Sequence, residues 1–417
     1  MDTQNTPVHI KLWHREFWMM AFANLLLMMS AYMLIPALPP YLLQQGYSCL
    51  QVGCVMGAYG IGVFVLGTFC SYLIQRYRRN HVCQYSILAV ALCVAAQYYL
   101  DFIVNVKMEF WALVLSRFAQ GAFLGLAEMT LASTLIIDTC ESFQRTEANY
   151  TASWFARFAL SLGPVASILV FQVFDYQGVL IASVASALVS FLLITLVKFP
   201  FKAPSDTMSK FSLDRFFLPQ GFLLFVNLAM ITCVVGMLFS LHETETFYAM
   251  LMAGFLIALW AEKYVFPDAD LKSEVLTGLV LLIAAILIQF TDQRPAMEMI
   301  SPAMIGFGIG IIGSRFLLFY IKLAKHCQRG TSQSSFFLSW EFGLSLGLFL
   351  GIGFLGNHAV GDMQGLFPQV HAEHKYILLT SLAILAVSLA FYNFCVHPWY
   401  TLGFVSYLNE CICIIYS

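Results

Sequence analysis

Charged residues are the scarcest class in this chain. Only 11% of its 417 residues are Asp, Glu, Lys or Arg, whereas 60% are hydrophobic. A soluble domain carries roughly 25% charged residues, so this chain has too few charges to cover a water-exposed surface of its size. The net charge of -2 gives no bias toward nucleic acid. The composition therefore indicates an integral membrane protein and no nucleic-acid partner.

Several chemical signatures are also missing. The eleven cysteines contain no CxxC pair, so we interpret them as helix-packing residues rather than metal ligands or disulfides. HExxH and Walker A sequences do not occur, and the histidines between residues 356 and 375 have no fixed ligand spacing. We therefore expect no enzyme, no cofactor, no metal site and no direct use of ATP.

The N-terminal region lacks the cleavage signature of a secretory leader. The polar start through Arg15 runs into a long apolar segment at Phe17 without a small-residue cleavage site. We expect this first segment to remain in the membrane.

Twelve apolar segments are long enough to span a bilayer. A crossing helix needs about 20 apolar residues, and its backbone must satisfy its hydrogen bonds within the helix. The segments cover residues 17–38, 50–74, 82–103, 110–137, 148–173, 179–197, 217–239, 247–266, 275–290, 300–321, 332–355 and 376–395. The sequence therefore predicts an all-α integral membrane protein with twelve transmembrane helices.

Basic residues are distributed unequally between the two sides of this arrangement. With the N terminus in the cytoplasm, fifteen Lys and Arg fall in cytoplasmic segments and only Lys107, Arg294 and Lys375 fall outside. Positively charged loops are retained in the cytoplasm. We therefore expect a multi-pass protein of the cell inner (plasma) membrane with a cytoplasmic N terminus.

A short repeat divides the chain into two similar halves. The segment Arg157-Phe-Ala-Leu-Ser-Leu-Gly163 returns 184 residues later as Glu341-Phe-Gly-Leu-Ser-Leu-Gly347, with five identities in seven positions. Two parallel six-helix repeats explain this pattern. The expected units are an N-terminal bundle (1–197), a cytoplasmic linker (198–216), a C-terminal bundle (217–396) and an apolar tail (397–417). We interpret the tail as interfacial, with a thirteenth crossing as the alternative.

Three segments carry patterns of a known family. They are Arg117-Phe-Ala-Gln120-Gly121 in the fourth predicted helix, Gly163-Pro164 in the fifth, and Gln75-Arg76-Tyr77-Arg78-Arg79 after the second. In turn they resemble the RxxQG pattern, the GP core of the antiporter motif and the GxLaDrxGrr loop of the major facilitator superfamily. The chain is most similar to the twelve-helix branch of drug and metabolite efflux proton antiporters. This resemblance implies two six-helix bundles, a proton-coupling role for the arginine and a packed hinge at the Gly-Pro pair.

The loop signature departs from the family pattern. Gln75 stands in place of the aspartate, whereas the equivalent loop of the second half keeps an acidic residue, Glu262. If the family's cytoplasmic charge latch is retained, we expect it to use Arg76 and Arg79 in the first half and Glu262 in the second, with Arg315 as the partner of Glu262. Charges that serve only membrane topology are the alternative.

Four charges within the predicted spans mark a candidate site. Glu128 follows Arg117 by eleven residues, which places both on one helix face, and Arg157 and Glu341 occupy matching repeat positions. Intramembrane charges normally face a partner or a wet cavity, and transporters bind substrate and ions near the midplane between repeats. We expect these four residues to line one cavity. Buried ion pairs with a purely structural role, or a snorkelling Arg117, are the alternatives.

These features predict a secondary active transporter that exports a small organic molecule by proton-coupled alternating access. A proton-coupled uptake symporter for a metabolite, and a transporter-like sensor or lipid-handling protein, are the alternatives. The expected partners are a small-molecule substrate, protons and membrane lipids, and we expect a monomer. The aromatic residues that could line a pocket or simply pack helices are Tyr59, Trp154, Trp260 and Trp340.

Overall fold

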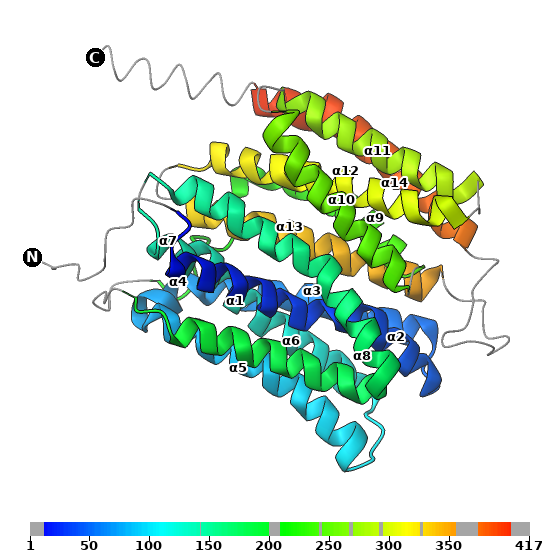
Figure 1. Cartoon of the computed structure of the whole chain (residues 1–417). Coiled ribbons are helices and arrows are strands. Elements are labelled where there is room, and N and C mark those ends of the chain that lie inside the picture. The colour runs from blue at the N-terminus through cyan, green and yellow to red at the C-terminus, as the bar shows by residue number, and fades with distance from the viewer. Residues whose placement is uncertain are drawn as a thin grey trace, which may run out of the picture.

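The computed structural model describes residues 12–141, 143–199, 209–241, 244–266, 270–291, 295–325, 328–355 and 374–401. Every regular element among these residues is helical. The helices lie side by side, with the first half of the chain in the lower part of Figure 1 and the second half in the upper part. The predicted all-α class is confirmed.

The first half begins with two helices that form one crossing, and most later crossings also consist of more than one element. Its helices are α1 (Arg15–Tyr32), α2 (Leu34–Gln44), α3 (Cys49–Val65), α4 (Gly67–Arg76), α5 (Arg79–Tyr98), α6 (Phe110–Thr130), α7 (Ile136–Asp138) and α8 (Arg145–Thr195). Two π-helical turns, η1 (Tyr99–Ile103) and η2 (Leu131–Leu135), continue α5 and α6.

The second half contains six crossings, each built around one long helix. The helices are α9 (Phe222–Phe239), α10 (Glu245–Tyr264), α11 (Leu271–Thr291), α12 (Pro295–Leu323), α13 (Arg329–Leu348) and α14 (His374–Phe391). The 3-10 turn η3 (Pro219–Gly221) precedes α9, and the π-helical turns η5 (Phe349–Phe354) and η6 (Tyr392–Val396) extend α13 and α14.

The described residues contain twelve crossings. Ten helices are long and apolar enough to span a membrane, and α3 with α4, bent by 44°, makes an eleventh span. Helix α8 has 51 residues, about 75 Å at 1.5 Å per residue, which is more than twice the bilayer core. Its backbone leaves helical geometry at Asp175 (φ 54°, ψ -166°), and the chain turns back there (Figure 1). Helix α8 therefore supplies two crossings.

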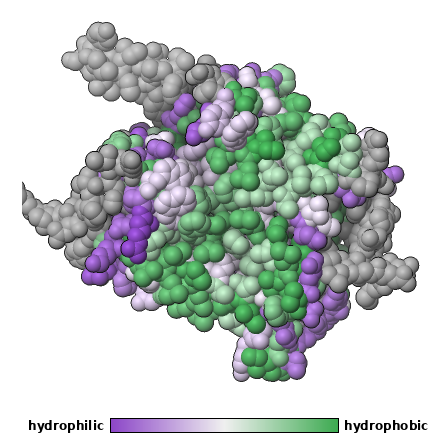
Figure 2. Space-filling view, in the orientation of Figure 1, coloured by the Kyte–Doolittle hydropathy of each residue, from purple (hydrophilic) through white to green (hydrophobic). Residues whose placement is uncertain are grey.

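The surface has the polarity of a membrane protein. Hydrophobic side chains form a broad band across the middle of the face in Figure 2, and hydrophilic side chains gather at its two ends. Large apolar residues such as Trp111, Leu115 and Phe394 are among the most exposed. This band has the character expected of a lipid-facing surface.

Small residues allow equivalent helices to approach closely in both halves. A Cβ atom on Gly121 of α6 would lie 2.1 Å from the carbonyl oxygen of Tyr59 in α3, and one on Gly306 of α12 would lie 2.1 Å from that of Leu251 in α10. The repeat glycines behave alike, because Gly163 packs on α1 and Gly347 packs on α9. The two bundles are therefore pseudo-symmetric, as the repeat predicts.

The two bundles meet along two helix pairs. Helix α8 packs on α10 in one pair, and α3 packs on α13 and η5 in the other. The second contact is close where η5 meets the start of α3, because a Cβ on Gly53 would lie 2.8 Å from the Cα of Gly353. A small cavity lies between the bundles, lined by residues of α1, α6, α8 and α13.

Two of the predicted units, the tail and the linker, are described by the structure only in part. The last described helix continues to Thr401, so the first five residues of the predicted tail belong to it, and residues 402–417 lie outside the described part. Residues 200–208 of the predicted linker also lie outside it. The remainder of the linker contacts both bundles, as described below.

Candidate functional site

A small cavity lies between the two bundles near the middle of the fold. Its volume is about 20 Å³, which is room for about one water molecule. The lining residues are Met28, Tyr32, Glu128, Ser153, Ala156, Arg157, Gln333, Phe336, Phe337, Trp340 and Glu341. Three of the four charges predicted to share a cavity, Glu128, Arg157 and Glu341, are among them.

Glu341 is the most enclosed of these charges. Its side chain, on α13 of the C-terminal bundle, has no exposed surface. Both oxygens accept hydrogen bonds from the N-terminal bundle: the Tyr32 hydroxyl on α1 donates to Oε1, and the Tyr59 hydroxyl on α3 donates to Oε2 at 3.1 Å. The carboxyl group of Glu341 therefore joins the two bundles through two tyrosines.

Glu128 faces the same cavity from α6 and is also buried. The side-chain amide of Asn24, on α1, lies against it and against the carbonyl of Ala152. With its nitrogen turned toward Glu128, this amide donates to the two carboxylate oxygens at 2.6 and 3.1 Å. Two acidic groups from different bundles thus share one small space.

Arg157 is held by neutral groups. Its Nη1 donates to the carbonyl of Gly310 and the hydroxyl of Ser314, both at 2.8 Å, and Nη2 donates to the Ser153 hydroxyl at 2.8 Å. Its guanidinium also lies 4.0 Å from the ring centroid of Trp154. Because Gly310 and Ser314 belong to α12, Arg157 connects α8 to the opposite bundle without a carboxylate partner within ion-pair distance among the described residues.

Arg117 does not line the cavity, contrary to the prediction. It is buried in α6, donates to Gln120 Oε1 at 2.6 Å and lies 5.2 Å from the centroid of the Tyr59 ring. Tyr59 lies between Arg117 and the cavity. One face of its ring is turned toward Arg117, and its hydroxyl group donates a hydrogen bond to Glu341. The RxxQG segment therefore acts as one unit: Gln120 holds the arginine, and Gly121 lets α6 approach the backbone of Tyr59.

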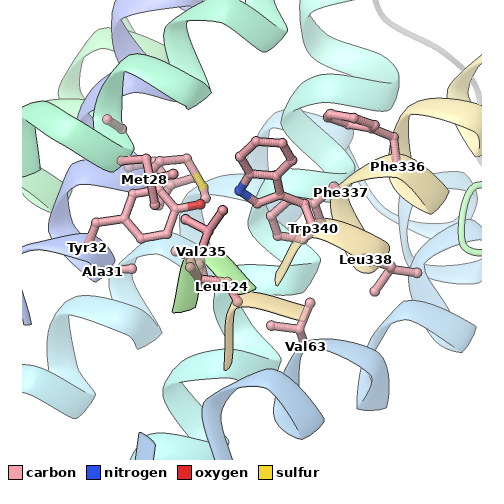
Figure 3. Packing of buried hydrophobic residues seen from close by; sticks show 14 of the residues in the cluster. Met28, Ala31, Tyr32, Val63, Leu124, Val235, Phe336, Phe337, Leu338 and Trp340 are labelled. Carbon is pink, nitrogen blue, oxygen red and sulfur yellow. The ribbon is translucent and has the colours of Figure 1, made fainter. Parts of the chain in front are cut away.

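An apolar and aromatic wall completes the site. Figure 3 shows the Tyr32 ring and Met28 on one side facing the indole of Trp340 on the other, with Phe336 and Phe337 on the same helix as the indole. The Phe336 and Trp340 rings lie 5.8 Å apart. Such a wall suits the apolar body of an organic molecule.

The other candidate aromatics divide between the site and the lipid surface. Trp154 lies under Arg157, whereas Trp260 is 63% exposed on α10. Trp154 therefore contributes to the site from the inner face of its helix, and Trp260 lies on the outer face of its helix. Gly163, the glycine of the predicted Gly163-Pro164 hinge, packs against Met29 and Tyr32 of α1. The predicted packed hinge therefore lies directly behind the Tyr32 contact with Glu341.

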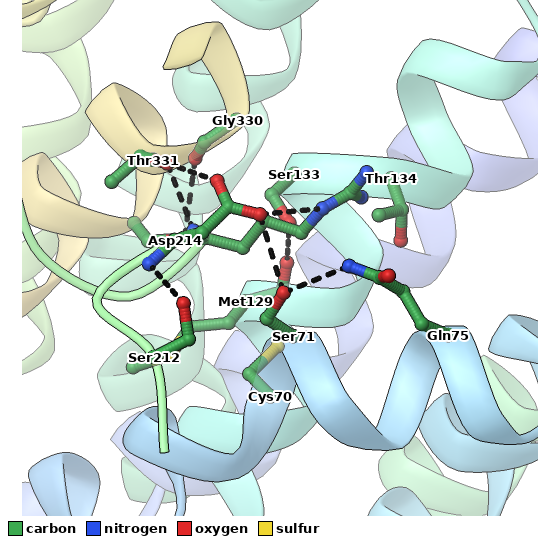
Figure 4. A network of polar contacts seen from close by, with 12 residues as sticks. Cys70, Ser71, Gln75, Met129, Ser133, Thr134, Ser212, Asp214, Gly330 and Thr331 are labelled. Carbon is green, nitrogen blue, oxygen red and sulfur yellow. Dashed lines mark hydrogen bonds and ion pairs between the residues drawn. The ribbon is translucent and has the colours of Figure 1, made fainter. Parts of the chain in front are cut away.

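The linker closes one end of the space between the bundles, the end that the sequence assigns to the cytoplasm. Asp214 accepts a hydrogen bond from the Ser71 hydroxyl on α4 and another from Thr331 on α13, both at 3.2 Å. Figure 4 shows Asp214 at the centre of this network. The backbone N–H of Arg215 also donates to Thr331 Oγ1 at 2.8 Å. One linker carboxylate therefore ties both bundles together.

Two further linker contacts support this closure. The Phe216 ring fills the space beside Gly67, where a Cβ would lie 2.2 Å from the ring, at the bend between α3 and α4. Leu218 donates its N–H to the Ser335 hydroxyl of α13 at 2.7 Å. Partial burial lowers the pKa of Arg215, and the neighbouring Asp214 carboxylate counteracts that shift.

The predicted latch residues form different pairs from the one expected. Arg79 pairs with Asp138 inside the first half, and Arg315 pairs with Glu274 inside the second. The predicted pairing of Glu262 with Arg315 is wrong, because Glu274 on α11 satisfies the arginine. Glu262 instead accepts a hydrogen bond from the Tyr150 hydroxyl of α8, across the bundle interface.

Arg76 ends α4 and is exposed. In the same loop, Gln75 donates to the Ser71 hydroxyl at 3.0 Å, and this hydroxyl in turn donates to Asp214. The family pattern has an aspartate at the position of Gln75. In this chain the carboxylate of Asp214, from the linker, lies close to that position instead.

Three residues that contribute to these sites do not belong to any sequence motif. Tyr32 and Asn24 lie in an apolar segment, and Asp214 lies in a stretch that looks like a simple linker. The one available signal for Asn24 is an amide within a long apolar run, which requires a buried partner. Nothing in the sequence pairs Tyr32 with Glu341, 309 residues away.

Comparison with known proteins agrees with the fold. A family model described as the Major Facilitator Superfamily matches residues 20–348. A search of curated sequences found no match.

Three solved structures illustrate the likeness. A bacterial homolog of the human lysosomal transporter Spinster, in an inward-facing state, has a TM-score of 0.66 at 14% identity and covers 95% of this chain and 97% of its own. A bacterial homologue of the iron transporter ferroportin, in an outward-facing state, has a TM-score of 0.63 at 16% identity, covering 93% and 100%. The nucleoside transporter NupG has a TM-score of 0.61 at 12% identity, covering 90% and 99%.

Proposed function

Because the chain belongs to the major facilitator superfamily of membrane transporters, we propose that it is a secondary active transporter that exports a small organic molecule in exchange for protons. The transport mode is alternating access, in which the two bundles rock around the central site. The single observation that carries this proposal is the carboxyl group of Glu341, buried between the bundles and bonded to Tyr32 and Tyr59.

The position of Glu341 suits a coupling group. A carboxylate inside the membrane is costly unless it has a partner or a function. Glu341 loses its two tyrosine contacts when the bundles move apart and regains them when the bundles close. Its proton occupancy is therefore linked to the conformation of the transporter. Glu128, which faces the same cavity, provides a second carboxyl group for the same exchange.

The described conformation is closed around this site. A cavity of about 20 Å³ is far below the roughly 300 to 1,000 Å³ of a typical ligand pocket, so an organic substrate requires the bundles to separate. The Asp214 network closes the cytoplasmic side and the α3–η5 contact closes the outer side. Opening either side in turn would give alternating access.

The substrate site that we propose combines charge and apolar surface. Glu128, Glu341 and Arg157 supply charged groups, and the wall formed by Phe336, Phe337 and Trp340 supplies apolar contact. The structural neighbours are different transporters: a bacterial homolog of a lysosomal transporter, a nucleoside transporter and a bacterial homologue of an iron transporter. At identities of 12 to 16% their substrates do not transfer to this chain.

Export is supported by the likeness of the Arg117–Gly121 and Gly163-Pro164 segments to those of efflux antiporters. The cellular setting that we propose is the inner (plasma) membrane, with a cytoplasmic N terminus, surrounding lipids and a monomeric state. Arg76 and Arg79 lie on the side assigned to the cytoplasm.

The test uses purified protein in proteoliposomes that contain the pH dye pyranine. A panel of drugs, amino acids, nucleosides and short peptides is added on each side in turn, and proton movement is recorded with the membrane potential clamped. We expect at least one compound to move protons in the direction opposite to its own flux. Proton movement in the same direction would indicate uptake symport, and no movement with any compound would favour the sensor class.

A further inference from the structure

A groove on the N-terminal bundle lies apart from the central site. Its volume is about 520 Å³, within the roughly 300 to 1,000 Å³ of typical ligand pockets. Its walls come from the end of α4, the start of α5 and the second half of α6. All of its lining residues belong to the first half of the chain, so the groove is separate from the interface where we place the substrate.

The groove opens on the lipid-facing side of α5. Tyr85, which lines the groove, is 67% exposed, and the exposed residues Leu88 and Leu92 continue along α5. Spacings of three and four residues place these side chains on one face of the helix. Exposed apolar side chains on one face of a membrane-spanning helix contact lipid. A lipid chain can therefore enter the groove directly from the bilayer.

Apolar side chains form most of the wall. They are Leu73 of α4, Val82 of α5, and Phe123 and Leu126 of α6. Val82 and Leu126 are buried, whereas Leu73 and Phe123 are half-buried. The hydroxyl of Ser86, which also lines the groove, donates to the backbone carbonyl of Val82 at 2.8 Å. This wall suits a hydrocarbon chain better than a polar molecule.

Basic residues line the end of the groove nearest the turn between α4 and α5. Helix α4 ends at Arg76 and α5 begins at Arg79, and Arg78 and His81 line the groove beside this turn. Arg78 is exposed, and His81 is half-buried with its ring centroid 6.1 Å from that of Tyr85. No Asp or Glu is among the described residues that line the groove. Its charge therefore favours an anionic group at this end.

The groove extends from the membrane boundary into the hydrocarbon core. Ser86 lies seven residues beyond the first residue of α5, Arg79, which is about 10 Å along the helix axis. At the opposite end, the Tyr77 side chain is 58% exposed, as expected of an aromatic residue at a membrane–water interface. A phospholipid has the same polarity along its length, with a phosphate group at the boundary and acyl chains in the core.

We propose that this groove binds one anionic phospholipid, with its phosphate group against Arg78 and His81 and one acyl chain between α4, α5 and α6. Basic pockets between transmembrane helices on the cytoplasmic side bind anionic head groups, and the sequence assigns this end of the bundle to the cytoplasm. The guanidinium of Arg78 and an N–H of His81 are suitable donors to phosphate oxygens. This lipid site goes beyond the proposed function and depends neither on the substrate nor on proton coupling.

The test is native mass spectrometry of the delipidated full chain in detergent, with phosphatidylglycerol or phosphatidylcholine of the same acyl chains added. The variant Arg78→Gln/His81→Gln is compared with Lys263→Gln/Lys322→Gln, a matched control that removes two exposed basic residues from the last turns of α10 and α12. Leu73→Trp keeps the basic residues and fills part of the groove from a half-buried position. Size-exclusion profiles and thermal unfolding report the folding of each variant.

We expect the wild type to bind phosphatidylglycerol about tenfold more tightly than phosphatidylcholine, and Arg78→Gln/His81→Gln to lose this preference. Leu73→Trp should weaken the binding of both lipids, and the control should match the wild type. No preference in the wild type, or an equal loss in the control, overturns the inference. Unchanged binding in Leu73→Trp overturns the placement of an acyl chain in the groove.

A second measurement needs only the wild type. Phosphatidylglycerol with a photoreactive diazirine in one acyl chain should label peptides of α4, α5 and α6 that line the groove, and labelling confined to other helices overturns the inference. Glycerol 3-phosphate, which has the phosphate group without the chains, should not compete; effective competition would identify a site for soluble phosphate instead. Neither experiment measures transport, so failure of the proposed function would leave the lipid site standing.

Discussion

The hydroxyl group of Tyr59 donates a 3.1 Å hydrogen bond to Glu341 Oε2 across the interface between the two bundles. The same tyrosine ring faces the guanidinium of Arg117. One side chain therefore connects the arginine of the RxxQG segment to the carboxyl group that we assign to proton coupling, although the two charges do not share a cavity.

Tyr59→Phe removes this donor and keeps the ring. Because a hydrogen bond to a charged group contributes about 1.5–3 kcal/mol, we expect the free energy of unfolding to fall by an amount of that order. Thermal unfolding in detergent measures the change. Tyr85→Phe, at an exposed position on α5, is the control, and an equal effect there would show that the Glu341 contact contributes nothing particular.

Arg117→Ala should abolish transport in a folded, membrane-inserted protein. The change removes the charge that faces Tyr59 and leaves Gln120 without its partner. Transport assays at matched expression, with size-exclusion profiles as the folding check, measure the outcome. Wild-type activity would place the arginine outside the mechanism and weaken the efflux assignment.

Much of the fold was predictable because the membrane imposes strong constraints. Long apolar runs must be helices, and their number and the charge asymmetry between loops follow from the sequence directly. The five-residue identity between the segments at Arg157 and Glu341 predicts two similar halves, and Gly163 and Gly347 occupy equivalent close contacts. The break at Asp175 that divides α8 was predictable too, because the short polar segment Asp175-Tyr-Gln-Gly178 separates the apolar spans expected at 148–173 and 179–197.

The site was predictable only in part. Glu128, Arg157 and Glu341 were identifiable because charges are rare within apolar spans, and all three line the cavity. Arg117 shares a helix face with Glu128, but helical spacing carries no information about the Tyr59 ring that separates it from the cavity. Likewise, no local pattern reveals that Glu274 rather than Glu262 pairs with Arg315, since pairing depends on how different helices pack.

Asp214→Ala should favour opening of the linker end, which we assign to the cytoplasm. The change removes hydrogen bonds from Ser71 and Thr331, each contributing about 1 kcal/mol, so the open population should rise by about tenfold or more. The measurement is the alkylation rate of a cysteine placed at Ser133, which lies beside Gly330 at the closed end, in a cysteine-free background. Lys210→Ala, at an exposed linker position, is the control, and no difference between the two variants would contradict the closure role.

The proposed orientation predicts which loops a membrane-impermeant reagent reaches. A cysteine at Asn105, in the loop before α6, should react from outside intact cells, and one at Ser209, in the described part of the linker, should react only in inverted vesicles. Both positions are exposed. The opposite pattern would reverse the proposed orientation.

The most direct test of the central claim is transport by Glu341→Gln in proteoliposomes. Glutamine keeps the shape of the protonated side chain but cannot bind or release a proton, so we predict loss of uphill transport driven by a proton gradient and retention of counterflow. Glu298→Gln, at an exposed position on α12, should retain both. Uphill transport by Glu341→Gln at the wild-type rate, with unchanged dependence on pH, would contradict the assignment of Glu341 as the coupling group.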